Sequence, residues 1–436
     1  MRARLATAQL LALQQRSARI AVIGQGYVGL PVALRAHEVG FSVVGFDLDE
    51  RRIAELCNGR SYVGDVSDAS LQKALAGRYL PTADPSALHD FDVAVVSVPT
   101  PLHDGAPDLS AIESAGRLLA AHLRPGACVI LESTTYPGTT TELLGPILES
   151  GSGLQAGTDF ALGYSPERID PGNTTWGFVE TPKVVAGIDE DSLRLVDTFF
   201  AALVQRTVAV SSPAAAELTK LLENTFRHVN IALINELAMF AKDLGIDIWE
   251  VVDAASTKPF GYMRFTPGPG VGGHCLPVDP SYLSWRVRQH LGRPFRVVEL
   301  ANDINEHMPS YVFDRVTALL NEHRKPVAGS RILLLGLAYK RGTSDWRESP
   351  TVPLAERLSN AHADVVICDP YIAAVNTSQL DWPLVGFTSD ELGAADLVVI
   401  MVDHAQFDEA VIVNSSQLVF DTKHLIKGVL PNGEYL

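Results

Sequence analysis

Short apolar runs alternate with helical patterns in the first half of the chain. The runs lie at 19–23, 92–98, 127–131 and 160–164, and a polar or glycine-containing loop follows each of them. Runs of this length between turn residues are typical of buried strands, and the helical segments between them are typical of crossover connections. We therefore predict a doubly wound, mainly parallel sheet, with a last strand at 207–211.

The pattern changes at Pro213 to one long helical repeat. Apolar residues recur there every three or four positions until Gly245, which supplies a helix stop. Further helices are predicted at 246–255, after Pro280 and across 297–323. The middle of the chain is therefore expected to be helical throughout.

A second α/β pattern begins at 331–335 and continues with apolar runs at 364–368, 396–402 and 417–421. We predict an α/β protein with two Rossmann-like doubly wound domains joined by a central all-helical domain that contains a long helix. The expected segments are an N-terminal extension at 1–18, forming a short surface helix or a frayed tail, and domains at 19–212, 213–328 and 329–436.

Composition and charge narrow the classes of function. The chain has 436 residues and a formal net charge of −16, which argues against a nucleic acid or an anionic membrane as partner. No apolar run reaches the ~18 residues of a membrane span, and no signal cleavage site is evident. The four cysteines show neither CxxC nor zinc spacing, so we predict no metal site and a cytoplasmic protein with reduced thiols.

A glycine motif follows the first predicted strand. Gly24, Gly26 and Gly29 give G-x-G-x-x-G between that strand and a helix at about 28–38, and the next strand ends at Asp47, 23 residues after Gly24. This spacing supplies a tight turn, a close approach to a pyrophosphate and a carboxylate for the adenosine ribose. It predicts a dinucleotide site.

The carboxylate of Asp47 disfavours a 2′-phosphate, so NAD is predicted in preference to NADP; Arg51 and Arg52 keep NADP as an alternative. The loops after the later strands, which contain Thr100 and Thr134, should face the cofactor, because ligands of open parallel sheets lie beyond the carboxyl ends of the strands.

A second chemical signal lies in the loop 267–280. Four glycines and four prolines in these fourteen residues exclude regular structure and surround Cys275, with His274 before it and Asp279 four residues after it. Cys275 is a candidate nucleophile; the alternative is a Gly/Pro loop with an incidental thiol. Cys57, Cys128 and Cys368 are interpreted as structural.

Two polar residues stand out on the long helix. Lys220 and Asn224 are four apart and share one face, with largely apolar flanks that favour a buried pair over a solvated stripe. In the second α/β domain the glycine triad is absent, so no second NAD site is predicted. Its first loop, 340–350, is rich in cations and hydroxyls and suits a phosphate or uracil-like ligand, or a domain interface.

A cysteine nucleophile beside a dinucleotide site indicates aldehyde chemistry, with a thiohemiacetal, hydride transfer and thioester hydrolysis. From about Arg19 to the last strand the chain also resembles the nucleotide-sugar 6-dehydrogenases, the UDP-glucose/UDP-N-acetylhexosamine dehydrogenase family. The motifs that carry the resemblance are GQGYVGLP, SVPTP, ESTTYPGTT, YSPERIDPGN, ELTKLLENTFR, STKPFGYM, PGPGVGGHCLPVDP and GLAYKRGTSDWRESP. It implies four-electron oxidation of a sugar C6 alcohol to a carboxylate, with two NAD⁺ and one water.

The resemblance also implies roles for single residues. Cys275 would attack the C6 aldehyde, Lys220 and Asn224 would stabilise oxyanionic intermediates, Asp279 with Thr134 would manage protons in alcohol oxidation, and Glu167 would assist thioester hydrolysis. Cofactor contacts would come from Gly24, Gly26, Tyr27, Val28, Gly29, Asp47, Arg52, Thr100, Thr134 and Arg347. Substrate contacts would come from Glu167, Arg168, Lys220, Asn224, Phe265, Gly272, Tyr339 and Lys340. The family further implies a homodimer or higher homo-oligomer.

The substrate remains open among several sugars. GGHC with STKPFGYM upstream resembles the UDP-N-acetylglucosamine or N-acetylmannosamine branch, whereas Arg264 departs from it and keeps UDP-glucose and dTDP-glucose as alternatives. His274 is interpreted as a structural loop residue. The rival functions are a two-electron β-hydroxyacid-type dehydrogenase, which would yield one NADH and need no cysteine, and a non-enzymatic nucleotide-sugar binding protein, which would need a decayed site.

Overall fold

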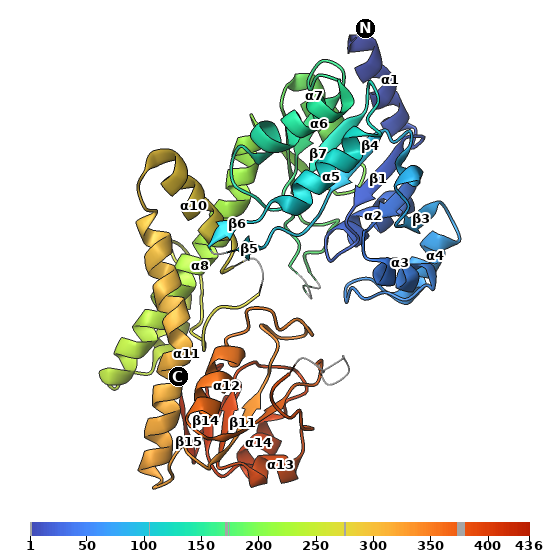
Figure 1. Cartoon of the computed structure of the whole chain (residues 1–436). Coiled ribbons are helices and arrows are strands. Elements are labelled where there is room, and N and C mark those ends of the chain that lie inside the picture. Colours follow the sequence, from blue (N-terminus) through green and yellow to red (C-terminus); the bar gives the residue numbers. More distant parts are fainter. Residues whose placement is uncertain (1, 104, 171–172, 174, 274–275, 373–379) are drawn as a thin grey trace. The chain divides into compact units, whose positions relative to one another are not determined.

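The computed structural model describes the chain except for residues 1, 104, 171–172, 174, 274–275 and 373–379 (Figure 1). It divides into two compact units, which are described separately. The first comprises Met1–Glu223 and Trp285–Gly292, and the second comprises Asn224–Ser284 and Arg293–Leu436.

The first unit is built on an eight-stranded sheet with the order β10-β9-β8-β7-β4-β1-β2-β3. The strands are β1 Arg19–Ile23, β2 Ser42–Phe46, β3 Tyr79–Thr82, β4 Val93–Val96, β7 Cys128–Leu131, β8 Ala161–Tyr164, β9 Lys183–Gly187 and β10 Thr207–Ala209. All neighbouring strands pair in parallel except β8 and β9, which are antiparallel. The predicted doubly wound fold is confirmed.

Helices cover both faces of this sheet (Figure 1). They are α1 Arg2–Gln14, α2 Gly29–Glu38, α3 Glu50–Cys57, α4 Asp68–Leu75, α5 Ser110–Ala120, α6 Gly145–Ser152 and α7 Glu190–Ala201, and a small hairpin joins β5 Leu102–His103 to β6 Ala106–Pro107. Alternate residues of β1 enter two cores, because side chains alternate across a strand. Ile20 and Val22 pack with α1, α2 and α7, and Ala21 and Ile23 pack with α5 and α6.

The N-terminal helix contributes to the first of these cores. Leu13 and Ala18 are fully buried, and α1 packs against α7. Helical structure was one of the two expectations for this segment, but its last turn is part of the core rather than a surface feature.

The long helix α8 (Pro213–Asp243) begins in the first unit and continues in the second. It ends as predicted before Gly245, whose φ of +69° is the left-handed conformation that terminates helices. The other helices of the middle section are α9 Ile248–Ser256, α10 Asp279–Leu291 and α11 Arg296–Glu322.

The second unit contains a five-stranded parallel sheet with the order β12-β11-β13-β14-β15. Its strands are β11 Arg331–Leu335, β12 Asp364–Cys368, β13 Leu397–Ile400, β14 Val419–Asp421 and β15 Gly433–Tyr435, with helices α12 Thr351–Asn360, α13 Ser389–Ala394 and α14 Glu409–Ser415. The second predicted doubly wound domain is therefore confirmed.

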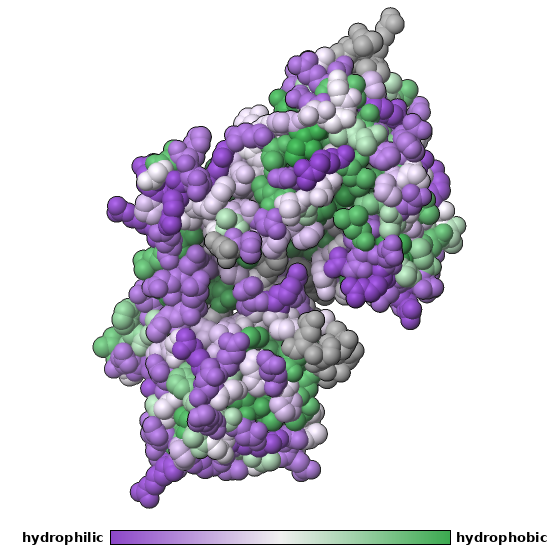
Figure 2. Space-filling model, viewed as in Figure 1, coloured by the Kyte–Doolittle hydropathy of each residue, from purple (hydrophilic) through white to green (hydrophobic). Residues whose placement is uncertain are grey.

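Besides the two-residue strands β5 and β6, three strands of the large sheets lie outside the predicted set: β3, β9 and β15. β3 and β15 are edge strands of three or four residues, and β3 contains Pro81, which is tolerated at an edge. β9 is a short apolar run that begins with Lys183. None of the helices in the described part of the chain is long and apolar enough to cross a membrane. The face drawn in Figure 2 is mostly hydrophilic, with small apolar areas.

Candidate active site

The three glycines of the first motif have different geometric tasks. Gly24 has a φ of +90°, and a Cβ on it would lie 2.1 Å from the Ser97 carbonyl oxygen; a Cβ on Gly29 would lie 1.9 Å from the Gly24 carbonyl oxygen. A Cβ on Gly26 would meet no atom within 4 Å. The outer glycines therefore permit the turn and its packing, while Gly26 leaves open space at the start of α2, where a pyrophosphate would approach.

Asp47 follows β2 and lies beside the glycine turn at the carboxyl edge of the sheet. Its Oδ2 accepts a hydrogen bond from the Gln25 backbone N–H at 2.8 Å, and its Oδ1 accepts one from the Asp49 N–H at 2.9 Å. Arg52 Nη1 lies 3.8 Å from Asp47 Oδ2. These residues fit the adenosine end of NAD, because the carboxylate is fixed beside the turn with acceptor capacity for a ribose hydroxyl.

Gln25 fixes the shape of this turn, and sequence reasoning did not single it out. The side chain is fully buried, and its Nε2 donates to the Val22 carbonyl oxygen at 2.9 Å. Two tyrosine hydroxyls hold it further: Tyr79 donates to Gln25 Oε1 at 2.8 Å and Tyr62 donates to the Gln25 carbonyl oxygen at 2.5 Å. Burial raises the pKa of both tyrosines, which therefore stay protonated as donors.

The loops after β4 and β7 are tied together at the carboxyl edge of the sheet. Thr100, which is 4% exposed, donates its hydroxyl to the Thr134 carbonyl oxygen at 2.9 Å. Ser133 Oγ accepts from the Val98 N–H at 2.9 Å. Thr100 and Thr134 thus lie in contact at the carboxyl edge of the sheet, where ligands of such sheets bind. Tyr27, 44% exposed, lies in the glycine turn.

A buried cluster of charges lies beside this edge. Lys183 Nζ donates to Glu132 Oε1 and lies 3.4 Å from Glu167 Oε2. Exposed fractions are 3% for Lys183, 0% for Glu132 and 8% for Glu167. Glu167 Oε1 accepts from the N–H groups of Arg168 (2.6 Å) and Ile169. Glu167 was predicted from the sequence, whereas Glu132 and Lys183 were not assigned a role.

Burial and the opposite charges have competing effects on the pKa values of this cluster. Burial raises the pKa of Glu132 to about 7, against the pull of the Lys183 ammonium and with a further contribution from Glu167. Burial alone would lower the pKa of Lys183, but the two carboxylates outweigh it and raise that pKa. The proton therefore stays on the lysine.

The start of α8 supplies two further groups of the first unit. Arg168 forms a two-point contact with Glu223, with Nη2–Oε1 at 2.6 Å and Nε–Oε2 at 3.3 Å. Lys220, 8% exposed, makes no ion pair with any described residue. Since buried cations in proteins are ordinarily paired, an unpaired ammonium indicates a place for an anionic or strongly polar ligand group.

One turn further on, in the second unit, Asn224 donates its side-chain N–H to Asp279 Oδ2. The two residues are 5% and 1% exposed, and Asp279 begins α10. The structure thus brings together two of the sequence-predicted catalytic residues. Cys275 and His274 lie outside the described residues.

Side-chain amides connect the start of the glycine–proline loop to the helices beneath it. The Gly268 N–H donates to Asn235 Oδ1 at 3.0 Å, and Asn235 Nδ2 donates to Asn305 Oδ1 at 2.9 Å. Asn305 Nδ2 reaches the His228 carbonyl oxygen at 3.3 Å, and His228 Nε2 lies 2.8 Å from Asn302 Oδ1. Burial lowers the pKa of His228. This chain of contacts was not predicted from the sequence.

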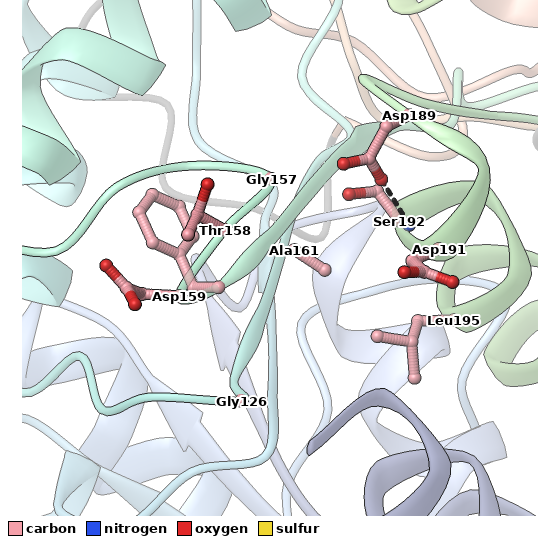
Figure 3. Close-up of a pocket in the computed structure, with 10 residues that line it drawn as sticks. Gly126, Gly157, Thr158, Asp159, Ala161, Asp189, Asp191, Ser192 and Leu195 are labelled. Atoms are coloured by element: carbon pink, nitrogen blue, oxygen red, sulfur yellow. Dashed lines mark hydrogen bonds between the residues drawn. The ribbon is translucent and has the colours of Figure 1, made fainter. Parts of the chain in front are cut away.

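A pocket of about 450 Å³ opens beside these residues in the second unit. Its lining includes His228, Val271, Pro277, Asn302, Asn305, Glu306, Trp346, Arg347 and Glu348. The volume suits part of a nucleotide-sized ligand. A further pocket in the first unit, of about 30 Å³, has room for little more than water. Figure 3 shows it between Asp159 and the start of α7, where Asp189 caps the helix by accepting from the Ser192 N–H.

The loop 339–350 packs against the glycines near the candidate nucleophile. A Cβ on Gly273 would lie 2.7 Å from the Tyr339 ring, and one on Gly272 would lie 2.6 Å from the Glu348 carbonyl oxygen. The absence of side chains on Gly272 and Gly273 therefore allows the loop 339–350 to pack closely against them. Lys340 Nζ lies 5.8 Å from the centre of the Tyr339 ring. Elsewhere in the unit, Phe265 packs edge-on against Phe226 at 5.8 Å.

In the second doubly wound domain, the acid after the second strand is buried and has an additional side-chain partner. Asp369 follows β12 as Asp47 follows β2, but it is 1% exposed, and its Oδ2 accepts from the N–H groups of Leu337 (2.8 Å) and Ala338 (2.9 Å). His404 Nε2 lies 3.1 Å from the same oxygen, and His404 Nδ1 accepts from the Gly342 N–H at 3.2 Å. The Asp369 carboxylate thus binds the loop that contains Leu337 and Ala338 and the side chain of His404.

A doubly wound sheet with an open glycine turn and an acid at the end of the next strand defines a dinucleotide-binding enzyme of the dehydrogenase class. Comparison with known proteins gives matches to one family in three consecutive segments of the chain. Residues 18–204 match the NAD binding domain, residues 214–307 the central domain and residues 333–428 the UDP binding domain of one family. The chain belongs to the UDP-glucose/GDP-mannose dehydrogenase family, whose members are NAD-dependent nucleotide-sugar dehydrogenases.

Individual relatives agree over nearly the whole length. The chain is 36% identical over 391 residues to UDP-N-acetyl-D-mannosamine dehydrogenase of Pyrococcus horikoshii, covering 89% of this chain and 90% of that protein. It is 35% identical to UDP-N-acetyl-D-glucosamine 6-dehydrogenase of Pseudomonas aeruginosa, covering 94% and 97%. A solved structure of the Pyrococcus horikoshii UDP-D-ManNAc dehydrogenase superposes with a TM-score of 0.86 at 33% identity, over 96% of this chain and 98% of that one.

Proposed function

We propose that this protein oxidises the C6 hydroxyl of a UDP-sugar to a carboxylate in a four-electron reaction that uses two NAD⁺ and one water. UDP-N-acetylglucosamine is the first candidate, because a similar protein carries that name and the motifs around Cys275 resemble that branch. UDP-N-acetylmannosamine is the second, on the name of another relative. The observation that carries the proposal is the burial of Lys220 and Asn224 one turn apart on α8.

In the first half of the reaction, Asp279 with Thr134 and a water molecule receives the proton of the C6 hydroxyl. Bound NAD⁺ supplies the hydride acceptor in both oxidations. The Cys275 sulfur then attacks C6 of the aldehyde and forms a C–S bond, the π pair of the C=O bond passes to the oxygen, and the thiol proton goes to water. The Lys220 ammonium and the Asn224 amide hold the oxygen that becomes negative in this step.

In the second half, oxidation of the thiohemiacetal gives a thioester on Cys275. Water attacks its carbonyl carbon, Glu167 takes a proton from that water, and the C–S bond breaks with its electron pair going to the Cys275 thiolate. The products are the uronate and the free enzyme. The buried position of Glu167 and its two backbone N–H partners support this role, since they fix the carboxylate.

The remaining sequence-predicted residues are proposed to bind rather than react. Residues 19–212 would bind NAD, 213–328 would carry the catalytic loop, and 329–436 would bind the nucleotide of the sugar. Arg168, Phe265, Gly272, Tyr339 and Lys340 would contact the substrate, and Arg347 would contact the cofactor. The open space beside Gly26 supports the first of these assignments.

The experiment that tests the proposal is the yield of NADH from limiting UDP-N-acetylglucosamine, UDP-N-acetylmannosamine and UDP-glucose. We expect two NADH per sugar from the true substrate. The Cys275→Ser variant should lose acid formation while it keeps NAD affinity, because the thiol acts only in the covalent stage. One NADH per sugar, or full turnover by Cys275→Ser, contradicts the mechanism.

We also propose that the protein is a homodimer that pairs through α8. Apolar side chains that are 42–73% exposed recur along this helix and just past its end: Phe226, Leu233, Leu237, Phe240 and Leu244. Such a continuous exposed stripe is typical of interaction surfaces. Light scattering of Leu233→Asp should show monomer, whereas Val429→Asp, at an 86% exposed position elsewhere, should leave the mass unchanged. A monomeric wild-type protein contradicts the proposal.

A further inference from the structure

The buried charges beside Glu167 do not balance within the described part of the chain. One ammonium, Lys183, serves two carboxylates, Glu132 and Glu167. Glu132 Oε1 holds the ammonium, while Glu132 Oε2 is buried and has no hydrogen-bond partner among the described residues. An ionised carboxylate oxygen without a partner is costly in a protein interior. A purely structural ion pair would not need the second carboxylate.

Among the described residues, two aromatic rings lie next to the ammonium and the next cation along the chain pairs elsewhere. Lys183 Nζ lies 5.6 Å from the centre of the Phe178 ring and 5.1 Å from that of Phe200 on α7. The nearest further cation in sequence, Arg168, turns to Glu223 on α8 and to the Pro182 carbonyl oxygen. The ammonium therefore acts on these two carboxylates at short range and in a poorly hydrated setting, where Coulomb interactions are strong.

We propose that Lys183 and Glu132 are positioning residues for Glu167: the ammonium orients the Glu167 carboxylate as the base of thioester hydrolysis, and Glu132 holds the ammonium in place. This inference rests on the proposed function of Glu167. It assigns the step no new reactant, because the proton that Glu167 takes from water can pass to the Cys275 thiolate as the C–S bond breaks.

The burial of Glu132 supports these different roles, in which Glu132 holds the ammonium and Glu167 acts as the base. It raises the pKa of Glu132 to about 7, so this group holds a proton for part of the time near neutrality. Whenever Glu132 is neutral, the charge of Lys183 is available to Glu167 alone. The hydrolysis rate should fall below a certain pH, the acid limb of its pH profile. Removing Glu132 should move this limb to lower pH, and removing Lys183 should move it to higher pH.

The test compares Glu132→Gln with the double variant Glu132→Gln/Lys183→Met, which removes one charge of each sign, so that the net charge of the cluster stays as in wild type while Glu167 loses its cation. Glu132→Gln leaves the ammonium to Glu167, and the acid limb of kcat should move to lower pH. The double variant removes the ammonium, and its acid limb should lie about 1–3 pH units above that of Glu132→Gln. Glu113→Gln, at an exposed ion pair on α5, is the charge-matched control and should behave as wild type.

Intact-protein mass spectrometry during turnover of UDP-N-acetylglucosamine, or of the sugar that wild type oxidises fastest, supplies a second measurement. The thioester adduct should accumulate below the acid limb of each protein, and so at lower pH in Glu132→Gln than in the double variant. Equal acid limbs in the two variants overturn the positioning role while wild type still yields two NADH. If wild type yields one NADH and no adduct, it is the proposed function that fails.

Discussion

At the residue scale, the two buried lysines of the first unit behave differently. Lys183 is held by two carboxylates, whereas Lys220 has no ion-pair partner among the described residues. A paired ammonium stabilises the structure around it, while an unpaired one is stabilised only when a ligand supplies the opposite charge or a strong dipole. We therefore expect Lys183 to support its neighbours and Lys220 to contact the substrate.

Asp47→Ala tests the cofactor edge. Loss of the carboxylate removes the expected ribose contact and the acceptor for the Gln25 N–H, so NAD affinity should fall by about 1–3 kcal/mol. Discrimination against NADP should fall as well, because the negative charge that repels a 2′-phosphate is gone. Calorimetric titration with both cofactors measures the effect. Glu55→Ala, at an exposed carboxylate on α3, should bind NAD as wild type does; unchanged affinity in Asp47→Ala would remove this residue from the site.

Glu132→Gln tests the buried cluster through stability. Because burial raises the pKa of Glu132 from 4.5 to about 7, the folded protein binds more protons than the unfolded chain between these values. The stabilisation is present below the unfolded pKa and is lost as the pH rises through the folded pKa. From about pH 5 to about pH 8, wild type should lose up to roughly 3 kcal/mol relative to Glu132→Gln in urea denaturation. A constant difference between the two proteins would contradict the buried-acid interpretation.

Sequence reasoning found the residues that stand in unusual patterns and missed those that support them. Gly24, Asp47 and Lys220 are visible because spacing or flanking residues mark them. Gln25 and Lys183 carry no such mark: a glutamine in the glycine turn and a lysine at the start of an apolar run are ordinary until the fold buries them. Their roles depend on partners 54 and 51 residues away, Tyr79 and Glu132, which local patterns cannot predict.

At the element scale, the strands that were predicted are those with a continuous apolar run, and they include the edge strands β10 and β12, whereas the interior strand β9 was missed. β1, β4 and β7 are apolar on both faces because helices cover both sides, so their runs are continuous. β3 and β15 are short edge strands and contain proline or charged residues, which weakens the signal. The long helix α8 was predicted to within a few residues, since its repeat and its glycine stop are both local features.

The N-terminal helix gives a prediction at this scale. Leu13 is fully buried against the core that includes α7, whereas Leu11 on the same helix is 50% exposed. Leu13→Ala should lower the free energy of unfolding by about 2–5 kcal/mol through lost burial and a cavity. Leu11→Ala should change it by less than about 0.5 kcal/mol. Chemical denaturation measures both, and equal effects would show that α1 does not contribute to the core in solution.

At the scale of the whole molecule, the chain contains a doubly wound fold twice, but the acid after the second strand is partly exposed in one copy (Asp47) and buried in the other (Asp369). Gly26 gives the first domain free space at its turn, whereas Asp369 in the second is occupied by two backbone N–H groups and His404. Because function depends on the side chains at the strand ends rather than on the fold, we expect only the first domain to bind the dinucleotide.

This contrast predicts the stoichiometry of cofactor binding. Titration of the intact protein with NAD should give one site per chain, and Asp47→Ala should weaken that site. Asp396→Asn, at a carboxylate elsewhere in the second domain that pairs with Lys325, should leave it unchanged. A second site of comparable affinity per chain, insensitive to Asp47→Ala, would show that the second domain also accepts the dinucleotide.

The different exposure of the cysteines makes selective chemical labelling of the protein possible. Burial raises the pKa of Cys128 and of Cys368 to about 12, so neither offers a thiolate to an alkylating reagent near neutral pH. Cys57, which we had interpreted as structural, is exposed. A Cys57→Ser protein would thus carry a single candidate for covalent labelling, Cys275. The mass gained with a maleimide, and its suppression by a bound sugar nucleotide, would report on the reactive loop without any assay of turnover.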